Sequence, residues 1–464
     1  MKFKLEPPEV PKDDPFRNDS LDRKPSAEAL TNLVANLSGP FVLALDSPWG
    51  TGKTTFLRMW RAYLEAHDYA CLYLNAWETD FSTDPLAALL GELNALAKTT
   101  DAIKKGFRQP FDRAKRIASV LGKRVLPVAA RLGTAGLLDL SEFTEKVMAD
   151  LAADSVKDAI DAYAAEKDLG EKFRESLTNA LKAFQQAGKK EQVIIFVDDL
   201  DRCRPTFAIE LLERVKHFLN IPNALFVIAI DKGQLGVSLK AIYGAGLNVD
   251  EYLRRFLALE FVLPPPNTET FTSALAQRFE VDAFFRGRTH PELRDEKGQM
   301  EKTFNGLVRL FSLNLHAREQ CFSRMRVAML MTPTDHYLYP VLLAALVVFR
   351  AASKDAYVRY ALQGGSAKEL VDVIRAIPDG NEFLMEHPGT VLEAHLIAAK
   401  TGARDDGLEI ARYEQILQDE AMPMPVRERA NKVVSIIAHL RNSERNPSLP
   451  YVVNKIELAA QTKS

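Results

Sequence analysis

The segment DSPWGTGKTT, residues 46–55, combines two glycines, a lysine and three threonines at the spacing of a phosphate-binding loop. It follows the apolar run FVLALD, 41–46, and precedes a helix expected to continue to about His67. At a turn of this kind several backbone N–H groups converge on one point, where the helix dipole also favours negative charge. The segment therefore predicts a cradle for a nucleotide's phosphates.

The residues of this loop have separate expected roles. Gly50 and Gly52 allow the close backbone approach, Lys53 reaches the β- and γ-phosphates, and Thr54 offers its hydroxyl to Mg²⁺. Thr55 is expected near the α-phosphate. The predicted nucleotide-contacting residues are Trp49, Gly50, Thr51, Gly52, Lys53, Thr54 and Thr55.

Ser47 stands where the usual pattern has its first glycine. Pro48 biases the residue before it toward extended backbone, which serine adopts readily. Proline donates no N–H, so the cradle must be built from the amides of residues 49–54. We therefore expect the loop to tolerate this serine.

A second acidic segment supplies the rest of the chemistry. VIIFVDDLDR, 193–202, is an apolar strand that ends in acids, the form of a Walker B segment. Asp198 is predicted to hold Mg²⁺ through water, and Asp199 to orient or deprotonate the attacking water. The next apolar run, 224–230, ends at Asp231, which we expect at the same sheet edge, either as a sensor of the bound nucleotide or as the N-cap of the next helix.

These motifs need a parallel sheet to position them. Continuous apolar runs at 41–46, 70–77, 193–197 and 224–230 alternate with helical segments, which predicts a doubly wound α/β P-loop fold with both faces of the sheet covered. The run 257–266 ends in three prolines and closes the sheet region. The predicted parts are an N-terminal arm, 1–25; the P-loop core, 26–98 and 189–268; a helical insert, 99–188; a helical lid region, 269–350; and a C-terminal helical region, 351–464.

Composition gives no global preference for a charged partner. The 464 residues include 60 basic and 62 acidic side chains, a net charge of -2. Three widely spaced cysteines fit a reducing compartment, and the N-terminus lacks the apolar core of a secretion signal, so a cytoplasmic protein is predicted. The apolar run 337–349 is too short for a membrane span and predicts a buried helix.

The insert carries a basic stripe. Between Lys104 and Arg131 nine residues are basic and only Asp112 is acidic, whereas the following stretch, 139–175, has more acidic than basic residues. Three interpretations stay open: the two halves pair as a helical hairpin, or the stripe, with Phe107 and Phe111, lies on an anionic membrane surface or contacts nucleic acid. Charged residues and Pro127 interrupt its apolar pieces, so no transmembrane span is expected.

Several segments together resemble the KAP family of P-loop NTPases, relatives of the STAND and AAA+ groups. They are SLDR at 20–23, WGTGKTT at 49–55, LNAWE at 74–78, DDLDRC at 198–203, IAID at 228–231 and EYLRRF at 251–256. The resemblance covers about residues 16–330 without the insert. It implies ATP as the nucleotide and places the Asp231 strand between the other two motif strands.

The resemblance also implies roles for arginines. Arg202 and Arg255 are candidates to stabilise charge on the transferring phosphoryl group, in cis or from a neighbouring subunit. Arg255 replaces the family's lysine, so only its charge is kept. The segment 313–325 resembles a helical lid that could supply Arg318.

Two functions follow as expectations. Prokaryotic members of the family are associated with phage exclusion, so one is an ATPase switch in defence, acting with a protein partner and in a homo-oligomer. The other is a nucleotide-binding scaffold with slow or no turnover, at the inner membrane surface. A nucleotide kinase is the weakest expectation, because no acceptor-binding lid is apparent in the sequence.

Overall fold

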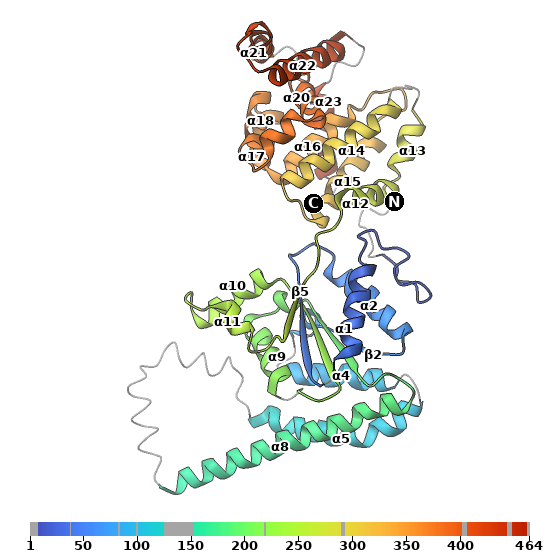
Figure 1. Ribbon diagram of the computed structural model, residues 1–464, viewed down its shortest axis with the longest axis vertical. Helices are drawn as coiled ribbons and strands as arrows, with labels where there is room; N and C mark the ends of the chain where they lie inside the picture. Colours follow the sequence, from blue (N-terminus) through green and yellow to red (C-terminus); the bar gives the residue numbers. More distant parts are fainter. Residues whose placement is uncertain are drawn as a thin grey trace. The chain divides into compact units, whose positions relative to one another are not determined.

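The computed structural model describes residues 8–37, 39–81, 84–98, 101–124, 153–217, 220–288, 293–400, 406–442 and 448–461. The chain divides into two compact units, Pro7–Pro265 and Pro266–Ser464 (Figure 1). The first unit contains the sheet and both predicted nucleotide motifs.

A five-stranded parallel sheet forms the centre of the first unit. Its strands are β1 (Phe41–Asp46), β2 (Ala70–Asn75), β3 (Val193–Asp198), β4 (Ala224–Ile230) and β5 (Leu259–Val262). They follow the order β2-β3-β4-β1-β5, and every neighbouring pair is parallel. This confirms the doubly wound α/β fold, with β4 between β1 and β3 as the family resemblance implies.

Helices cover both faces of this sheet, which explains the unbroken apolar runs of β3 and β4. One face packs Leu43 and Phe196 against Phe56 and Trp60 of the helix after the phosphate loop. The other buries the alternate strand residues, and the two cores together fix the positions of the strand ends. The covering helices are α1 (Lys24–Asn36), α2 (Lys53–Ala66), α4 (Pro85–Ala97), α9 (Pro205–His217) and α10 (Lys232–Tyr243), with the shorter η1 (Leu200–Arg202) and α11 (Val249–Leu253).

The second strand is shorter than predicted. β2 ends at Asn75, and residues expected to extend it form the short helix α3 (Ala76–Thr79). The Asn75 side chain explains the change, because its Oδ1 accepts hydrogen bonds from the backbone N–H groups of Trp77 at 3.1 Å and Glu78 at 3.2 Å. This N-cap starts a helix where the apolar pattern alone continues the strand.

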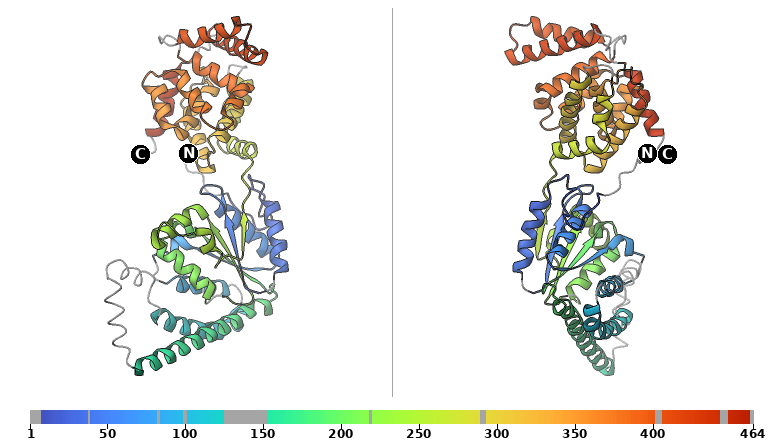
Figure 2. Two further views of the ribbon diagram at one scale, coloured as in Figure 1. Left: turned by 60° about the vertical axis from the view of Figure 1, so that its left-hand side comes forward. Right: turned by 90° about the vertical axis from the view of Figure 1, so that its right-hand side faces the viewer.

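The described part of the insert is a pair of long helices, α5 (Asp101–Arg124) and α8 (Ala153–Gln186), which lie side by side (Figure 2). Phe107 and Phe111 are buried between them, with the Phe107 and Phe184 ring centroids 5.8 Å apart. The expectation that these two phenylalanines lie on a membrane or nucleic acid is therefore wrong, because α8 covers them. The predicted stripe beyond Arg124 lies outside the described residues.

The second unit is helical. The apolar run 337–349 falls largely in α16, whose residues from Val341 to Phe349 are all buried, which confirms the predicted core helix. No helix in the described ranges is long and apolar enough to cross a bilayer. The helices are α12 (Thr268–Arg278), α13 (Val281–Arg286), α14 (Leu293–Leu310), α15 (Leu315–Leu330), α16 (Pro340–Ala352), α17 (Lys354–Leu362), α18 (Ala367–Arg375), α19 (Gly380–Met385), α20 (His387–Ala398), α21 (Asp406–Gln418), α22 (Met424–Asn442) and α23 (Leu449–Gln461).

Candidate nucleotide-binding site

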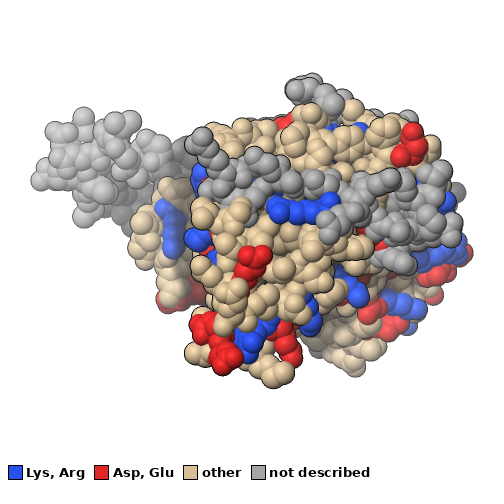
Figure 3. Space-filling view, turned by 90° about the horizontal axis from the view of Figure 1, so that it is seen from above, with Lys and Arg blue, Asp and Glu red and all other residues tan. Residues whose placement is uncertain are grey.

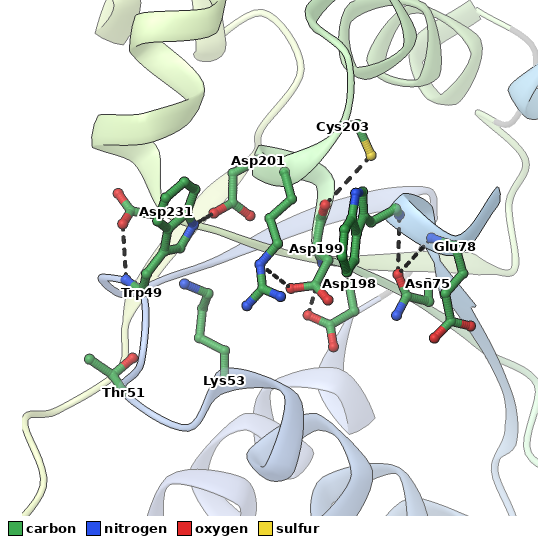
Figure 4. Close-up of polar contacts among 12 residues, drawn as sticks. Trp49, Thr51, Lys53, Asn75, Glu78, Asp198, Asp199, Asp201, Cys203 and Asp231 are labelled. Atoms are coloured by element: carbon green, nitrogen blue, oxygen red, sulfur yellow. Dashed lines mark hydrogen bonds and ion pairs between the residues drawn. The ribbon is translucent and has the colours of Figure 1, made fainter. Parts of the chain in front are cut away.

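The carboxyl ends of three neighbouring strands bring the predicted motifs together. β1 ends at Asp46, β3 ends at Asp198, and Asp231 directly follows β4. The phosphate loop leaves β1 at the same edge and leads to Lys53, the first residue of α2. In Figure 4 the Lys53 side chain lies between Asp231 on one side and the Asp198–Asp199 pair on the other.

The loop has the backbone that its glycines predict. Gly50 has φ of 76° and Gly52 has φ of 89°, conformations that other residues adopt only with strain. Ser47 is not among the described residues with positive φ, so a glycine is not required there. The Ser47 hydroxyl instead bonds the Thr51 hydroxyl at 2.7 Å, and Thr51 Oγ1 donates to the carbonyl of Pro48 at 2.7 Å. The serine thus stabilises the turn that precedes the cradle.

Lys53 is 7% exposed and its ammonium group lies inside the loop. Its Nζ donates to the carbonyl of Ser47, and to that of Pro48 at 3.3 Å. Burial lowers the pKa of Lys53, and four nearby carboxylates oppose this shift. These belong to Asp46, Asp198, Asp201 and Asp231. One buried cation therefore lies among several acids, a charge arrangement suited to a phosphate chain that arrives with a divalent cation.

Asp198 is completely buried and both of its carboxylate oxygens accept hydrogen bonds. The backbone N–H of Asp199 donates to Oδ1 at 2.9 Å, and the hydroxyl of Tyr73 donates to Oδ2 at 2.6 Å. Burial and the neighbouring Asp198 charge raise the pKa of Tyr73, so the phenol stays a donor. Sequence reasoning missed Tyr73, although its position two residues before Asn75, which pairs with Asp198, was an available signal.

Asp199 has an unusual backbone and an unusual acidity. Its φ of 57° is rare for a residue other than glycine and is typical of functional turns. Its side chain pairs with Arg202, Nε to Oδ1, at 3.1 Å. Burial, followed by the charge of Asp198, raises the pKa of Asp199 to about 6. The Arg202 guanidinium also lies 6.0 Å from the centroid of the exposed Trp77 ring.

Asp231 caps the next helix and also contacts the phosphate loop. Its Oδ1 accepts from the backbone N–H of Gln234 at 3.1 Å, which caps α10. Its Oδ2 accepts from the backbone N–H of Trp49 at 3.0 Å, so the carboxylate also contacts the phosphate loop. The Trp49 indole donates to Asp201, a contact that sequence reasoning did not anticipate. Two acids, Asp231 directly after β4 and Asp201 in η1, therefore hold Trp49.

Arg23, the last residue of the SLDR segment, is hydrogen-bonded to the phosphate loop. It is buried, and its guanidinium donates to the Thr51 carbonyl at 3.3 Å and to the carbonyl of Pro264, just after β5. Burial lowers the pKa of this arginine, and Asp19 partly offsets the shift. The family-like segment thus ties the phosphate loop to the end of the sheet, a role that the sequence did not reveal.

The remaining predicted residues are less closely connected. Thr54 and Thr55 are partly buried in the first turn of α2. Arg255 is exposed, with its guanidinium 5.9 Å from the Tyr252 ring centroid, and among the described residues it contacts none of the site carboxylates. Arg318 belongs to the second unit, where its Nε donates to the carbonyl of Leu313 at 2.8 Å.

Comparison with known proteins identifies the family to which this sequence is related. The model of the "KAP family P-loop domain" matches residues 23–314, a range that contains the phosphate loop and the double-aspartate segment. The chain belongs to the KAP family. Among curated proteins, this KAP chain is similar to the phage T7 exclusion protein of Escherichia coli (strain K12), with 23% identity over 269 residues. The match covers 54% of this chain and 33% of that relative, so the KAP chain spans about a third of the relative's length.

Proposed function

We propose that this KAP domain is a Mg²⁺-dependent ATPase, and that ATP binding and hydrolysis switch its conformation as part of defence against phage. One observation supports the proposal above the others. Lys53 and the Asp198–Asp199 pair, which lie far apart in the sequence, meet at one sheet edge beside a glycine-rich loop.

The donor set fits a nucleotide bound with Mg²⁺. Backbone N–H groups of residues 50–54 and the Lys53 ammonium would hold the phosphates, while the N–H of Trp49 donates to Asp231. The Thr54 hydroxyl and the Asp198 carboxylate would hold the cation, and two hydrogen bonds already orient that carboxylate. When bound, Mg²⁺ neutralises charge that develops on the phosphate oxygens.

Asp199 is the residue that we propose as the proton acceptor. With a pKa of about 6 it is ionised at pH 7.5, yet basic enough to take a proton from an attacking water. Arg202, one turn later, would stabilise charge on the phosphoryl group, and Asp231 would report on the loop through its bond to Trp49. Arg255 would act with Arg202 only if nucleotide binding or a neighbouring subunit brought it to the loop.

One contact favours the alternative, a nucleotide-binding scaffold with slow turnover. The ion pair between Arg202 and Asp199 occupies a carboxylate oxygen that would otherwise be free to accept from water. Breaking this pair would then be a step that a partner or a second subunit controls.

The proposed biological role is based on sequence similarity to a curated protein. The phage T7 exclusion protein is named for its action on a phage, and on this similarity we propose a defence role for the present chain. We further propose that the protein acts in the cytoplasm or at the inner membrane surface, with a protein partner and as a homo-oligomer.

Two variants test the enzymatic proposal. Lys53→Ala should abolish ATP binding, and Asp199→Asn should retain binding but lose phosphate release by about 10²-fold or more. Asp168→Asn, in an exposed ion pair on α8, is the matched control and should behave as wild type. An unchanged rate in Asp199→Asn would refute the hydrolytic assignment, while wild-type binding without turnover, with cell extract present, would favour the scaffold.

A further inference from the structure

One face of α5 carries positive charges that have no ion-pair partner in the described part of the first unit. Between residues 104 and 116 six basic side chains are exposed, with Asp112 the one acidic residue in that interval. They are Lys104, Lys105, Arg108, Arg113, Lys115 and Arg116. We call this set the α5 basic face. It differs from the face that Figure 3 presents, where acidic and basic side chains are interspersed.

Most of the apolar side of α5 is buried against neighbouring helices. Ile103, Phe107, Phe111 and Ala114 are buried in the core that α5 shares with α8. The Cβ that an alanine would add at Gly106 would lie 3.1 Å from Ala183 Cβ, so the two helices approach closely. The orientation of the basic face toward solvent is therefore fixed by packing.

The charges of the basic face are not balanced by its neighbour. In the described part of the chain none of the six side chains forms an ion pair, whereas on α8 Lys172 pairs with Asp168 at 2.6 Å. Lys104 and Arg108 are four residues apart, and Arg113 and Arg116 are three apart, so like charges are neighbours on the helix. Such like-charge pairs destabilise a helix by about 0.2–0.5 kcal/mol each; Asp112, four residues from both Arg108 and Arg116, offsets part of this, and a bound anion would offset more.

We propose that the α5 basic face binds the phosphate backbone of a nucleic acid duplex. From Lys104 to Arg116 the helix rises about 18 Å. A duplex presents one phosphate per about 1.7 Å of its axis, so about ten phosphates lie within that length. Lysine contributes point charges and arginine binds phosphate through two parallel hydrogen bonds.

The residues of the basic face favour a nucleic acid duplex over a single strand or a membrane surface. No aromatic side chain lies on the basic face on which unpaired bases could stack, which disfavours a single strand. No apolar side chain remains there to enter the acyl region of a bilayer, which disfavours a membrane surface. Helix α5, which carries this face, lies at the amino edge of the sheet and away from the phosphate loop (Figures 1 and 2). Duplex binding can therefore be tested separately from ATP turnover.

The test uses the full chain and fluorescent 30-base-pair DNA and RNA duplexes, with binding followed by anisotropy between 50 and 200 mM NaCl. The triple variant Lys105→Gln, Arg108→Gln and Arg116→Gln should bind at least about tenfold more weakly. With about six phosphate contacts in wild type, the slope of log K against log salt should be near -5, and near -2 to -3 in the triple variant. The DNA and RNA arms identify which duplex is preferred.

A matched variant removes three exposed charges from the neighbouring region, by Lys167→Gln, Lys182→Gln and Lys190→Gln, and should bind as wild type. Thermal unfolding confirms that both variants are folded. The proposal fails if wild type binds no duplex, if both variants lose or both keep affinity, or if single strands bind more tightly. Cosedimentation with vesicles of phosphatidylserine and phosphatidylcholine, without duplex binding, would also overturn it.

Discussion

Replacing Asp199 by asparagine should make the first unit more stable at pH 8 while it removes catalysis. In the folded chain the pKa of Asp199 is about 6, compared with an ordinary value of 3.8, because the carboxyl is buried beside Asp198. Its ionisation therefore costs the folded state free energy that the unfolded chain does not lose. Asparagine keeps the shape of the side chain and has no such cost.

The magnitude follows from the two pKa values. A difference of about two units corresponds to about 3 kcal/mol when Asp199 is fully ionised, at pH 8. At pH 5, below the folded-state pKa, about half of this cost remains, and it vanishes below about pH 3. The Arg202 ion pair lost in the variant offsets little, because that guanidinium is partly exposed and also lies over Trp77.

Urea unfolding of wild type and Asp199→Asn at pH 8 and pH 5 measures this effect. The variant should be more stable at pH 8 by up to about 3 kcal/mol, and its advantage should fall to about half at pH 5. A variant that is less stable at pH 8, or whose advantage does not depend on pH, would refute the claim that Asp199 is a destabilised, weakly acidic carboxyl.

Four further outcomes are expected. Phosphate release by wild type should fall about tenfold per pH unit below pH 6, as Asp199 takes up a proton, and a flat profile down to pH 5 would contradict this role. Tyr73→Phe removes a hydrogen bond to a buried charge, so half-maximal phosphate release should need severalfold more Mg²⁺; an unchanged requirement would argue against a positioning role. Ser47→Gly should change ATP affinity by less than about threefold, because the serine needs no special φ, and a larger loss in an equilibrium binding measurement would contradict that. Gly380→Ala should destabilise the second unit by more than about 3 kcal/mol in thermal or urea unfolding, because its Cβ would lie 1.8 Å from the Ile374 carbonyl, whereas Gly407→Ala meets nothing within 4 Å.

The sequence predicts the sheet well because burial on both faces leaves a strong local signal. β1 and β4 coincide with their apolar runs, and acids end the strands at Asp46 and Asp198. The strand order required the family resemblance, since apolar runs do not encode which strands are neighbours. β2 was overextended because a single side-chain cap at Asn75 outweighs two further residues of strand-like sequence.

The candidate site was predicted unevenly for a similar reason. Residues in the two motifs can be recognised in the sequence by their spacing. Tyr73 and Arg23 cannot, because they act through contacts that depend on strand register and tertiary packing. Two of the three interpretations of the insert placed Phe107 and Phe111 on a surface, because an amphipathic pattern alone does not show what covers the apolar side of a helix. In the structure α8 covers most of that side, and the charged side faces solvent.

Trp49 gives the phosphate loop an optical probe of its own. The chain has three tryptophans, of which Trp60 is fully buried and bonds Thr31 at 3.0 Å, and Trp77 lies near Arg202. The Trp49 indole is 41% exposed and bonded to Asp201, while its backbone amide bonds Asp231. Because indole emission depends on polarity and on nearby charge, a chain with phenylalanine at positions 60 and 77 would show loop rearrangement directly by fluorescence, with unmodified nucleotide and on the millisecond scale of a stopped-flow mixer.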